Sequence, residues 1–301
     1  MLVSRRSFHL MALGASAALW LPGCGSDSAE PEVDTDDIVK GTADKFAMPK
    51  ALRDYQDSHG WGRHHIEWHT VRQWDFLQKN YPDSIRWAKS QGWERAPIQE
   101  GAKGNGLEFL AMHRAMLRHL LGKFTAASYK PLFAGWTTPP TEVTDKDNPV
   151  LDKAAFNPNM AKAIARVTSD LDFATDDDFG LYLETRARPG TGNGYSTDVT
   201  AGVHNYLHNR FSNSKSPTNL GDPEVNMKNK LFWRCHGWID ARWTAFRAAK
   251  GLKETDPAYK EAIDRWTAHM NALGGLKAGA PASREPRPDV FNNFWAKDEQ
   301  P

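Results

Sequence analysis

The chain has 301 residues, of which 40% are hydrophobic and 25% are charged, and these proportions exclude a fibrous, collagen-like or wholly disordered protein. Its 38 Lys and Arg balance its 37 Asp and Glu, which excludes a surface that binds nucleic acid by bulk charge. Two cysteines cannot form a disulfide framework, whereas the 12 Trp and 11 His are unusually many.

The first 23 residues have the pattern of an export signal. Two adjacent arginines, at 5 and 6, precede an apolar stretch at 10–21 that is too short for a membrane-spanning helix. The segment resembles a twin-arginine export signal, and its end, Leu21-Pro22-Gly23-Cys24, resembles a lipobox. The resemblance implies that the twin-arginine machinery exports a bacterial lipoprotein, anchored through Cys24 on the periplasmic side of a membrane. A plain secretory signal with an incidental cysteine is the alternative.

Residues 24–48 are small, acidic and almost free of large apolar side chains, as is typical of a flexible tether. A domain at 49–275 is expected next, and an irregular tail at 276–301. Within the domain, apolar residues recur at three- and four-residue steps and no segment alternates strongly as a strand does. The sequence therefore predicts a mainly α fold with long irregular loops. The helices are expected at 63–79, 83–91, 106–124, 159–171, 200–211, 228–250 and 257–273.

Six histidines form the pattern from which the chemistry is inferred. His65 and His69, and again His204 and His208, are four residues apart, a spacing that places two imidazoles on one face of a helix. A single histidine in a strongly apolar helix follows each pair, namely His113 and His236. A pair and a single imidazole can bind one metal ion together, so the chain offers two such sets. Neutral imidazoles suit copper, zinc, nickel or iron, while the His-Glu-x-x-His and Cys-x-x-Cys motifs of zinc sites are absent.

The residues around these histidines resemble the motifs of type-3 (dinuclear) copper proteins, the family of tyrosinases, phenoloxidases and hemocyanins. Residues 64–69 resemble the first copper motif of hemocyanins and phenoloxidases, and 109–117 resemble the helix that carries the third ligand. Residues 204–208 resemble the second-site pair of tyrosinases, and 231–240 resemble the final motif of both groups. The resemblance implies a four-helix core around two copper ions, one bound by His65, His69 and His113, the other by His204, His208 and His236.

The activity that the resemblance implies is the oxidation of a small phenol or catechol to an o-quinone, with O2 as the oxidant. Asn205 directly follows the first ligand of the second set. It is therefore the candidate catalytic residue, with the role of orienting a water molecule or a substrate proton. Asp240 and Arg114 are expected to form ion pairs that support the ligands.

The chain departs from the tyrosinase pattern at three places. Gly104 and Cys235 each stand where tyrosinases usually have a histidine. Ser196 and Tyr195 stand where tyrosinases have the acidic residue that holds a water molecule, which favours diphenol oxidation over monophenol hydroxylation. Two alternatives stay open: a lipoprotein that binds O2 or copper at the same site without turnover, and a structural lipoprotein that binds no metal.

Overall fold

The computed structural model describes residues 46–140, 158–184, 202–212, 216–275 and 285–294. The expected export signal, Cys24, most of the expected tether, and Tyr195 and Ser196 lie outside these residues. The described residues are mainly helical and contain no β-strand, because their one extended pairing is an isolated bridge between Ala47 and Asn229. The expectation of a mainly α fold is confirmed.

The helices follow one another along the described chain as α1 (Lys50–Ser58), α2 (Trp61–Arg72), α3 (Trp74–Asn80), α4 (Pro82–Ser90), α5 (Asn105–Lys123), α6 (Lys130–Phe133), α7 (Pro158–Ala165), α8 (Asp176–Glu184), α9 (Val203–Arg210), α10 (Lys230–Ala249) and α11 (Pro257–Gly275). Short helical turns occur at Arg166–Asp170, Asn226–Lys228 and Asp289–Asn293. None of the helices in this described part has both the length and the apolar character needed to cross a membrane.

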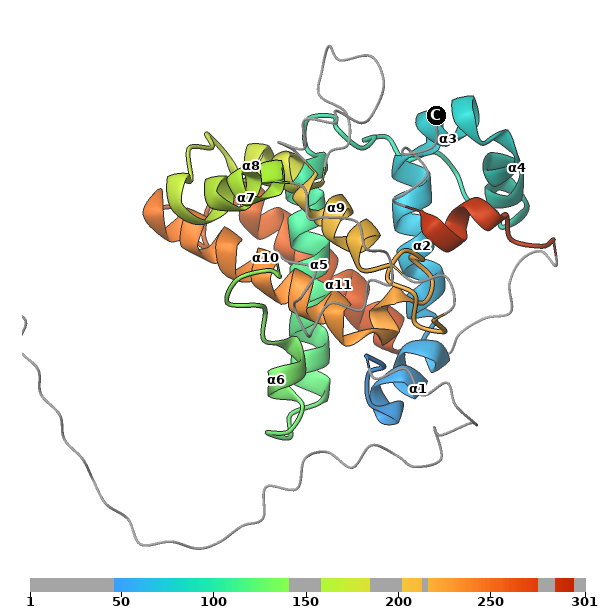
Figure 1. The fold of residues 1–301 in the computed structure, drawn as a ribbon, viewed down its shortest axis with the longest axis horizontal. Helices are drawn as coiled ribbons and strands as arrows, with labels where there is room; N and C mark the ends of the chain where they lie inside the picture. The colour runs from blue at the N-terminus through green and yellow to red at the C-terminus, as the bar shows by residue number, and fades with distance from the viewer. Residues whose placement is uncertain (1–45, 141–157, 185–201, 213–215, 276–284, 295–301) are drawn as a thin grey trace, which may run out of the picture. The chain divides into compact units, whose positions relative to one another are not determined.

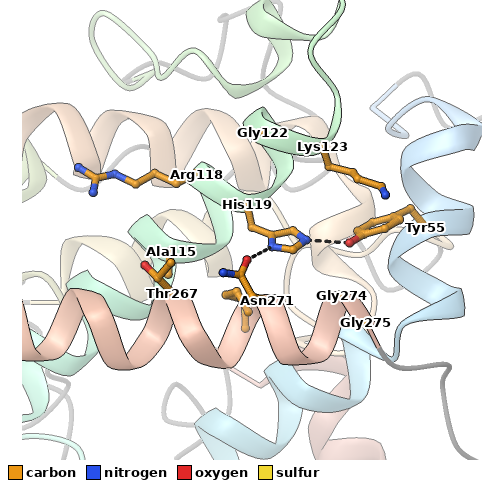
Figure 2. A pocket seen from close by; sticks show the side chains of 11 residues that line it. Tyr55, Ala115, Arg118, His119, Gly122, Lys123, Thr267, Asn271, Gly274 and Gly275 are labelled. Carbon is orange, nitrogen blue, oxygen red and sulfur yellow. Dashed lines mark hydrogen bonds between the residues drawn. The ribbon is translucent and has the colours of Figure 1, made fainter.

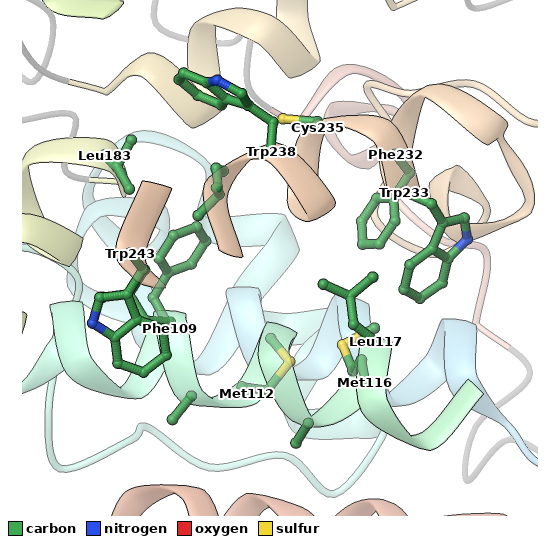
Figure 3. Close-up of a cluster of buried hydrophobic side chains, with 14 of the residues drawn as sticks. Phe109, Met112, Met116, Leu117, Leu183, Phe232, Trp233, Cys235, Trp238 and Trp243 are labelled. Atoms are coloured by element: carbon green, nitrogen blue, oxygen red, sulfur yellow. The ribbon is translucent and has the colours of Figure 1, made fainter. Parts of the chain in front are cut away.

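Helix α5 is the central element, and it packs against α8, α10 and α11 (Figure 1). It contacts α8 most closely at Gly106 and Gly180, where a Cβ on either glycine would collide with the backbone of the other helix. The face that α5 turns toward α10 is apolar: Phe109, Met112, Met116 and Leu117 lie opposite tryptophans and phenylalanines of α10 (Figure 3). This aromatic and aliphatic layer fixes the two helices side by side.

The helix expected at 63–79 is divided in the structure. Its first part ends at Arg72, Gln73 has φ −101° and ψ 18°, and α3 begins at Trp74. Helix α2 contributes to both hydrophobic clusters: Trp68 joins the main core and Ile66 joins a second cluster. After the bend, Trp74 and Leu77 of α3 join that second cluster as well.

The second hydrophobic cluster also contains part of the tail that is expected to be irregular. Phe291 and Phe294 are fully buried there, and Phe291 packs on Trp87 with 5.1 Å between ring centroids. Two phenylalanines three residues apart face the same side of the helical turn at Asp289–Asn293, which explains why this portion packs. Residues 285–294 are therefore a packed part of the domain.

Candidate metal centre

Four helices bring the six predicted histidines together. His65 and His69 come from α2, His113 from α5, His204 and His208 from α9, and His236 from α10. All six side chains are buried, with exposures between 0% and 3%. Because helices α5 and α10 are held in contact by the core, the third ligand of each expected set approaches its pair from a rigid support.

The first expected set is close in space. One ring nitrogen from each of His65, His69 and His113 lies within 4.8 Å of the others. The Nε2 atoms of His65 and His69 are 3.2 Å apart, as the spacing of four residues on one helix face leads one to expect.

The second expected set is arranged differently. The close group consists of His113, His204 and His236, whose ring nitrogens again lie within 4.8 Å of one another. His208 contacts this group through its Nε2, which is 3.3 Å from Nε2 of His236. The rings of His113 and His236 are stacked at 4.0 Å with 6° between their planes. His113 therefore belongs to both groups, and the six imidazoles form one continuous cluster.

Backbone carbonyls orient three of these rings. Nδ1 of His65 donates to the carbonyl of Pro223 (2.7 Å), Nδ1 of His113 to that of Phe109 (2.9 Å), and Nδ1 of His208 to that of Leu220 (2.9 Å). A carbonyl oxygen only accepts, so the proton of each neutral ring is on Nδ1. The lone pair is then on Nε2, the nitrogen that turns toward the cluster, and this is the usual arrangement behind metal-bound histidines.

Asn205 orients a fourth ring. Its Nδ2 donates to the backbone carbonyl of Glu184 (2.5 Å), which places its Oδ1 toward His204, where it accepts a hydrogen bond from Nδ1 (2.9 Å). The side chain is 1% exposed, and both of its polar atoms are used within the protein. The structure thus gives Asn205 a supporting contact to a histidine, and its role in orienting a water molecule or a substrate proton stays a prediction.

Glu184 is a buried carboxylate beside this contact that the sequence analysis did not select. It is 1% exposed, and it accepts a hydrogen bond from Nδ2 of Asn105, at the start of α5. Nothing in the pattern around Glu184 marks it, because it ends a helix that lies twenty residues before His204 and the two meet only in the fold.

Burial keeps the imidazoles neutral. It lowers the pKa of His65 to about 4 and that of His208 to about 3, because a charged ring would lose its hydration. Burial likewise places the pKa of His69, His113, His204 and His236 well below the usual range, and the neighbouring imidazoles add to the effect. Neutral rings with free lone pairs are the form in which histidine binds metal ions.

The donor set fits one or two transition-metal ions. The two groups contain nitrogen donors only, and Nε2 of His113 and Nδ1 of His236 are buried without a hydrogen-bond partner among the described residues. An unpaired buried polar atom is costly unless a ligand satisfies it. Cys235 is not in either group, and its burial raises the pKa of its thiol far above the usual range, so the thiolate that a metal requires is disfavoured.

Aromatic rings enclose the cluster. Trp68 lies 4.8 Å from His69, Phe109 lies 4.7 Å from His113 and 4.8 Å from His204, and Phe232 lies 4.1 Å from His236, measured between ring centroids. These rings lower the local dielectric constant and exclude water from the imidazoles.

Arg114 and Asp240 form the expected ion pair, with 2.5 Å between Nε and Oδ1. The guanidinium of Arg114 also lies over the ring of Trp243 and donates to the hydroxyl of Tyr259 (2.9 Å). These contacts join α5, α10 and α11, so Arg114 connects the two helices that carry His113 and His236.

A separate pocket of about 520 Å3 opens between α1, α5 and α11 (Figure 2). None of the six clustered histidines lines it. Three of its polar side chains contact one another: the hydroxyl of Tyr55 donates to Nε2 of His119 (2.7 Å), and Nδ1 of His119 donates to Oδ1 of Asn271 (3.3 Å).

Neither the family models nor the curated proteins contain a match to this chain.

Proposed function

We propose that the protein is a copper-dependent oxidase that converts catechols, and phenols more weakly, to o-quinones with O2. Two copper ions would be bound by His65, His69 and His113 and by His204, His208 and His236. The observation that carries the proposal is the cluster of six buried, neutral imidazoles from four helices, with Nδ1 of four rings bonded to an oxygen acceptor. Imidazole is a favourable donor for copper, and copper is the strongest binder in the divalent series.

The bound ions would supply the electron transfer, taking two electrons from each catechol and passing four to each O2. Two catechols then lose four protons and four electrons to become two quinones, while one O2 becomes two waters. The part of the protein is to keep the six imidazoles neutral, to fix four of their rings through Nδ1, and to exclude bulk water with Trp68, Phe109 and Phe232.

A second candidate is a lipoprotein that binds O2 or copper at the same cluster without turnover. The full burial of the six histidines favours this alternative, because a carrier covers its metal ions and an oxidase must admit a substrate. In either case the proposal retains the export signal and the lipid anchor at Cys24, which would place a folded, metal-loaded protein on the periplasmic side.

The test is the copper content of the purified full-length protein and its near-ultraviolet spectrum before and after hydrogen peroxide. About two coppers per chain with a peroxide-dependent band are expected, and a catechol assay then separates an oxidase from a carrier. Zero or one copper without a band would overturn the dinuclear site.

Substitution of single histidines refines the assignment. His113→Ala is expected to impair both sites, because His113 belongs to both close groups, and to abolish oxidase activity. His65→Ala is expected to remove one copper and leave the other. The control is His269→Ala, since His269 contacts His64 outside the two groups and its loss should leave two coppers bound.

A further inference from the structure

One loop orients a histidine in each half of the cluster. The carbonyl of Pro223 accepts the hydrogen bond from Nδ1 of His65 on α2, and the carbonyl of Leu220 accepts that from Nδ1 of His208 on α9. Only two residues separate these acceptors, and both carbonyl-bearing residues are buried. The position of this short loop therefore determines the ring orientation of two histidines that the proposed function assigns to different copper ions.

The packed C-terminal segment holds the same loop at the residues between and beside the two acceptors. The backbone N–H of Phe294 donates to the carbonyl of Gly221 (2.7 Å), and Nδ2 of Asn219 donates to the carbonyl of Asn292. The ring of Phe294 also lies against His69, with 5.9 Å between centroids. Residues 219–224 thus contact the histidines through two carbonyls. They contact the segment 285–294 through the carbonyl of Gly221 and the side chain of Asn219.

Arg287 makes the charged contacts of this segment. Its two terminal nitrogens donate to the two carboxylate oxygens of Asp222, at 2.7 and 2.5 Å, and one of them also lies 3.2 Å from the carboxylate of Glu224. The side chain of Asp222 is only 7% exposed and that of Arg287 22%, so solvent screens the pair weakly. A bidentate pair of this kind fixes direction as well as distance. Asp222 directly precedes Pro223, so the pair acts one residue away from the acceptor of His65.

We propose that residues 285–294 form a clamp on residues 219–224, and that Arg287 is a positioning residue for one histidine of each proposed copper site, His65 and His208. The clamp acts through the loop: Arg287 fixes Asp222, and the loop carbonyls fix His65 and His208. The metal part of this inference rests on the proposed function, whereas the orientation of the two rings does not.

The first test follows metal binding. In Arg287→Gln the copper affinity, measured by competition with a chelator, is expected to fall about 10-fold at both sites, as is usual when an outer partner of a ligand is removed. Arg287→Lys, which keeps the charge but loses the paired donors, is expected to recover part of this loss. Arg95→Gln is the matched control. Arg95 also forms a bidentate pair, with Asp75, but its hydrogen bonds do not involve residues 219–224. Its copper affinity and spectrum should be those of the wild type.

The second test needs no metal. In the metal-free protein, the Nδ1–H protons of His65 and His208 are expected to be protected from exchange with solvent. Arg287→Gln should make both protons exchange faster. The Nδ1–H of His113 should stay protected, because its acceptor lies on its own helix. Protection that is unchanged in Arg287→Gln would overturn the clamp.

Wild-type protein that binds no copper would overturn the proposed function, and the exchange measurement would still decide the clamp. If Arg287→Gln does not fold, Arg287→Lys is expected to give intermediate exchange, and wild-type exchange in it would contradict the proposal.

Discussion

Asn205 connects two helices through the two ends of one amide. Its Oδ1 accepts from His204 and its Nδ2 donates to the carbonyl that ends α8. A hydrocarbon side chain at this position would leave the Nδ1–H of His204 and the carbonyl of Glu184 without these partners, and the imidazole would be free to turn.

We therefore expect Asn205→Ala to weaken copper binding by the second set about 10-fold or more, with a smaller effect on the first set. Chelator competition in the purified variant measures the loss. The comparison variant is Asn271→Ala, which removes a similar amide contact to a histidine in the pocket beside Tyr55. Equal affinities in the wild type and in Asn205→Ala would show that the amide does not position the ligand.

At this scale the sequence reveals the clustered histidines better than the groups that orient them. The six histidines can be selected because a spacing of four residues and an apolar helix are visible in the chain. The carbonyls of Leu220 and Pro223 cannot be selected, because every residue has a carbonyl and only the fold decides which one meets an imidazole. Asn205 shows the same limit. Its place beside His204 is visible in the sequence, but the direction of its side chain depends on the hydrogen bond to Glu184.

Helices α5 and α8 cross with their backbones in close contact. Gly106 and Gly180 face each other there, and a Cβ on Gly106 would collide with the backbone of Asp177 and Leu181. Because the obstacle is backbone, the collision cannot be relieved by a side-chain rotation, and the helices would have to separate.

Gly106→Ala is accordingly expected to lower the free energy of unfolding by about 1–3 kcal/mol, as overpacking does, even though alanine favours a helix more than glycine. Gly122→Ala on the same helix is the control, since a Cβ there meets nothing within 4 Å. It is expected to raise the stability by about 0.5–1 kcal/mol. Urea denaturation of both variants gives the two values, and a stable Gly106→Ala protein would contradict the close contact.

The helices that the sequence predicts well are those with long periodic apolar faces. Helix α5 begins and ends within one residue of its expected range, and α11 extends two residues further. Helix α8 was not predicted, although Thr175 caps it by accepting a hydrogen bond from the N–H of Asp178, and three aspartates fill its first turn. That capping signal could have revealed it. The bend at Gln73 has no such signal, since neither a Pro nor a Gly marks it in the sequence.

Over the whole molecule, the helices that carry the clustered histidines come from distant parts of the chain. His65 and His236 are 171 positions apart in the numbering, yet both lie in one cluster with His113 between them. Packing of buried apolar side chains brings the helices together, but the cluster itself opposes folding, since it buries polar rings that are not all paired. A metal ion that binds the folded cluster would reverse that local cost.

The folded cluster should therefore gain stability from metal. A ligand that binds only the native state at a free concentration 1,000 times its dissociation constant stabilises the protein by about 4 kcal/mol, and in a domain of this size that corresponds to a rise of roughly 10 °C in Tm. We expect such a rise when copper is added to the metal-free protein, measured by calorimetry with and without a chelator.

His269→Ala should keep the rise in Tm, because His269 lies outside both groups, and His236→Ala should lose much of it. The same rise in His236→Ala would mean that copper stabilises the protein from another place. No rise in the wild type would mean that the six imidazoles are neutral core side chains and that the fold accepts their cost without a metal.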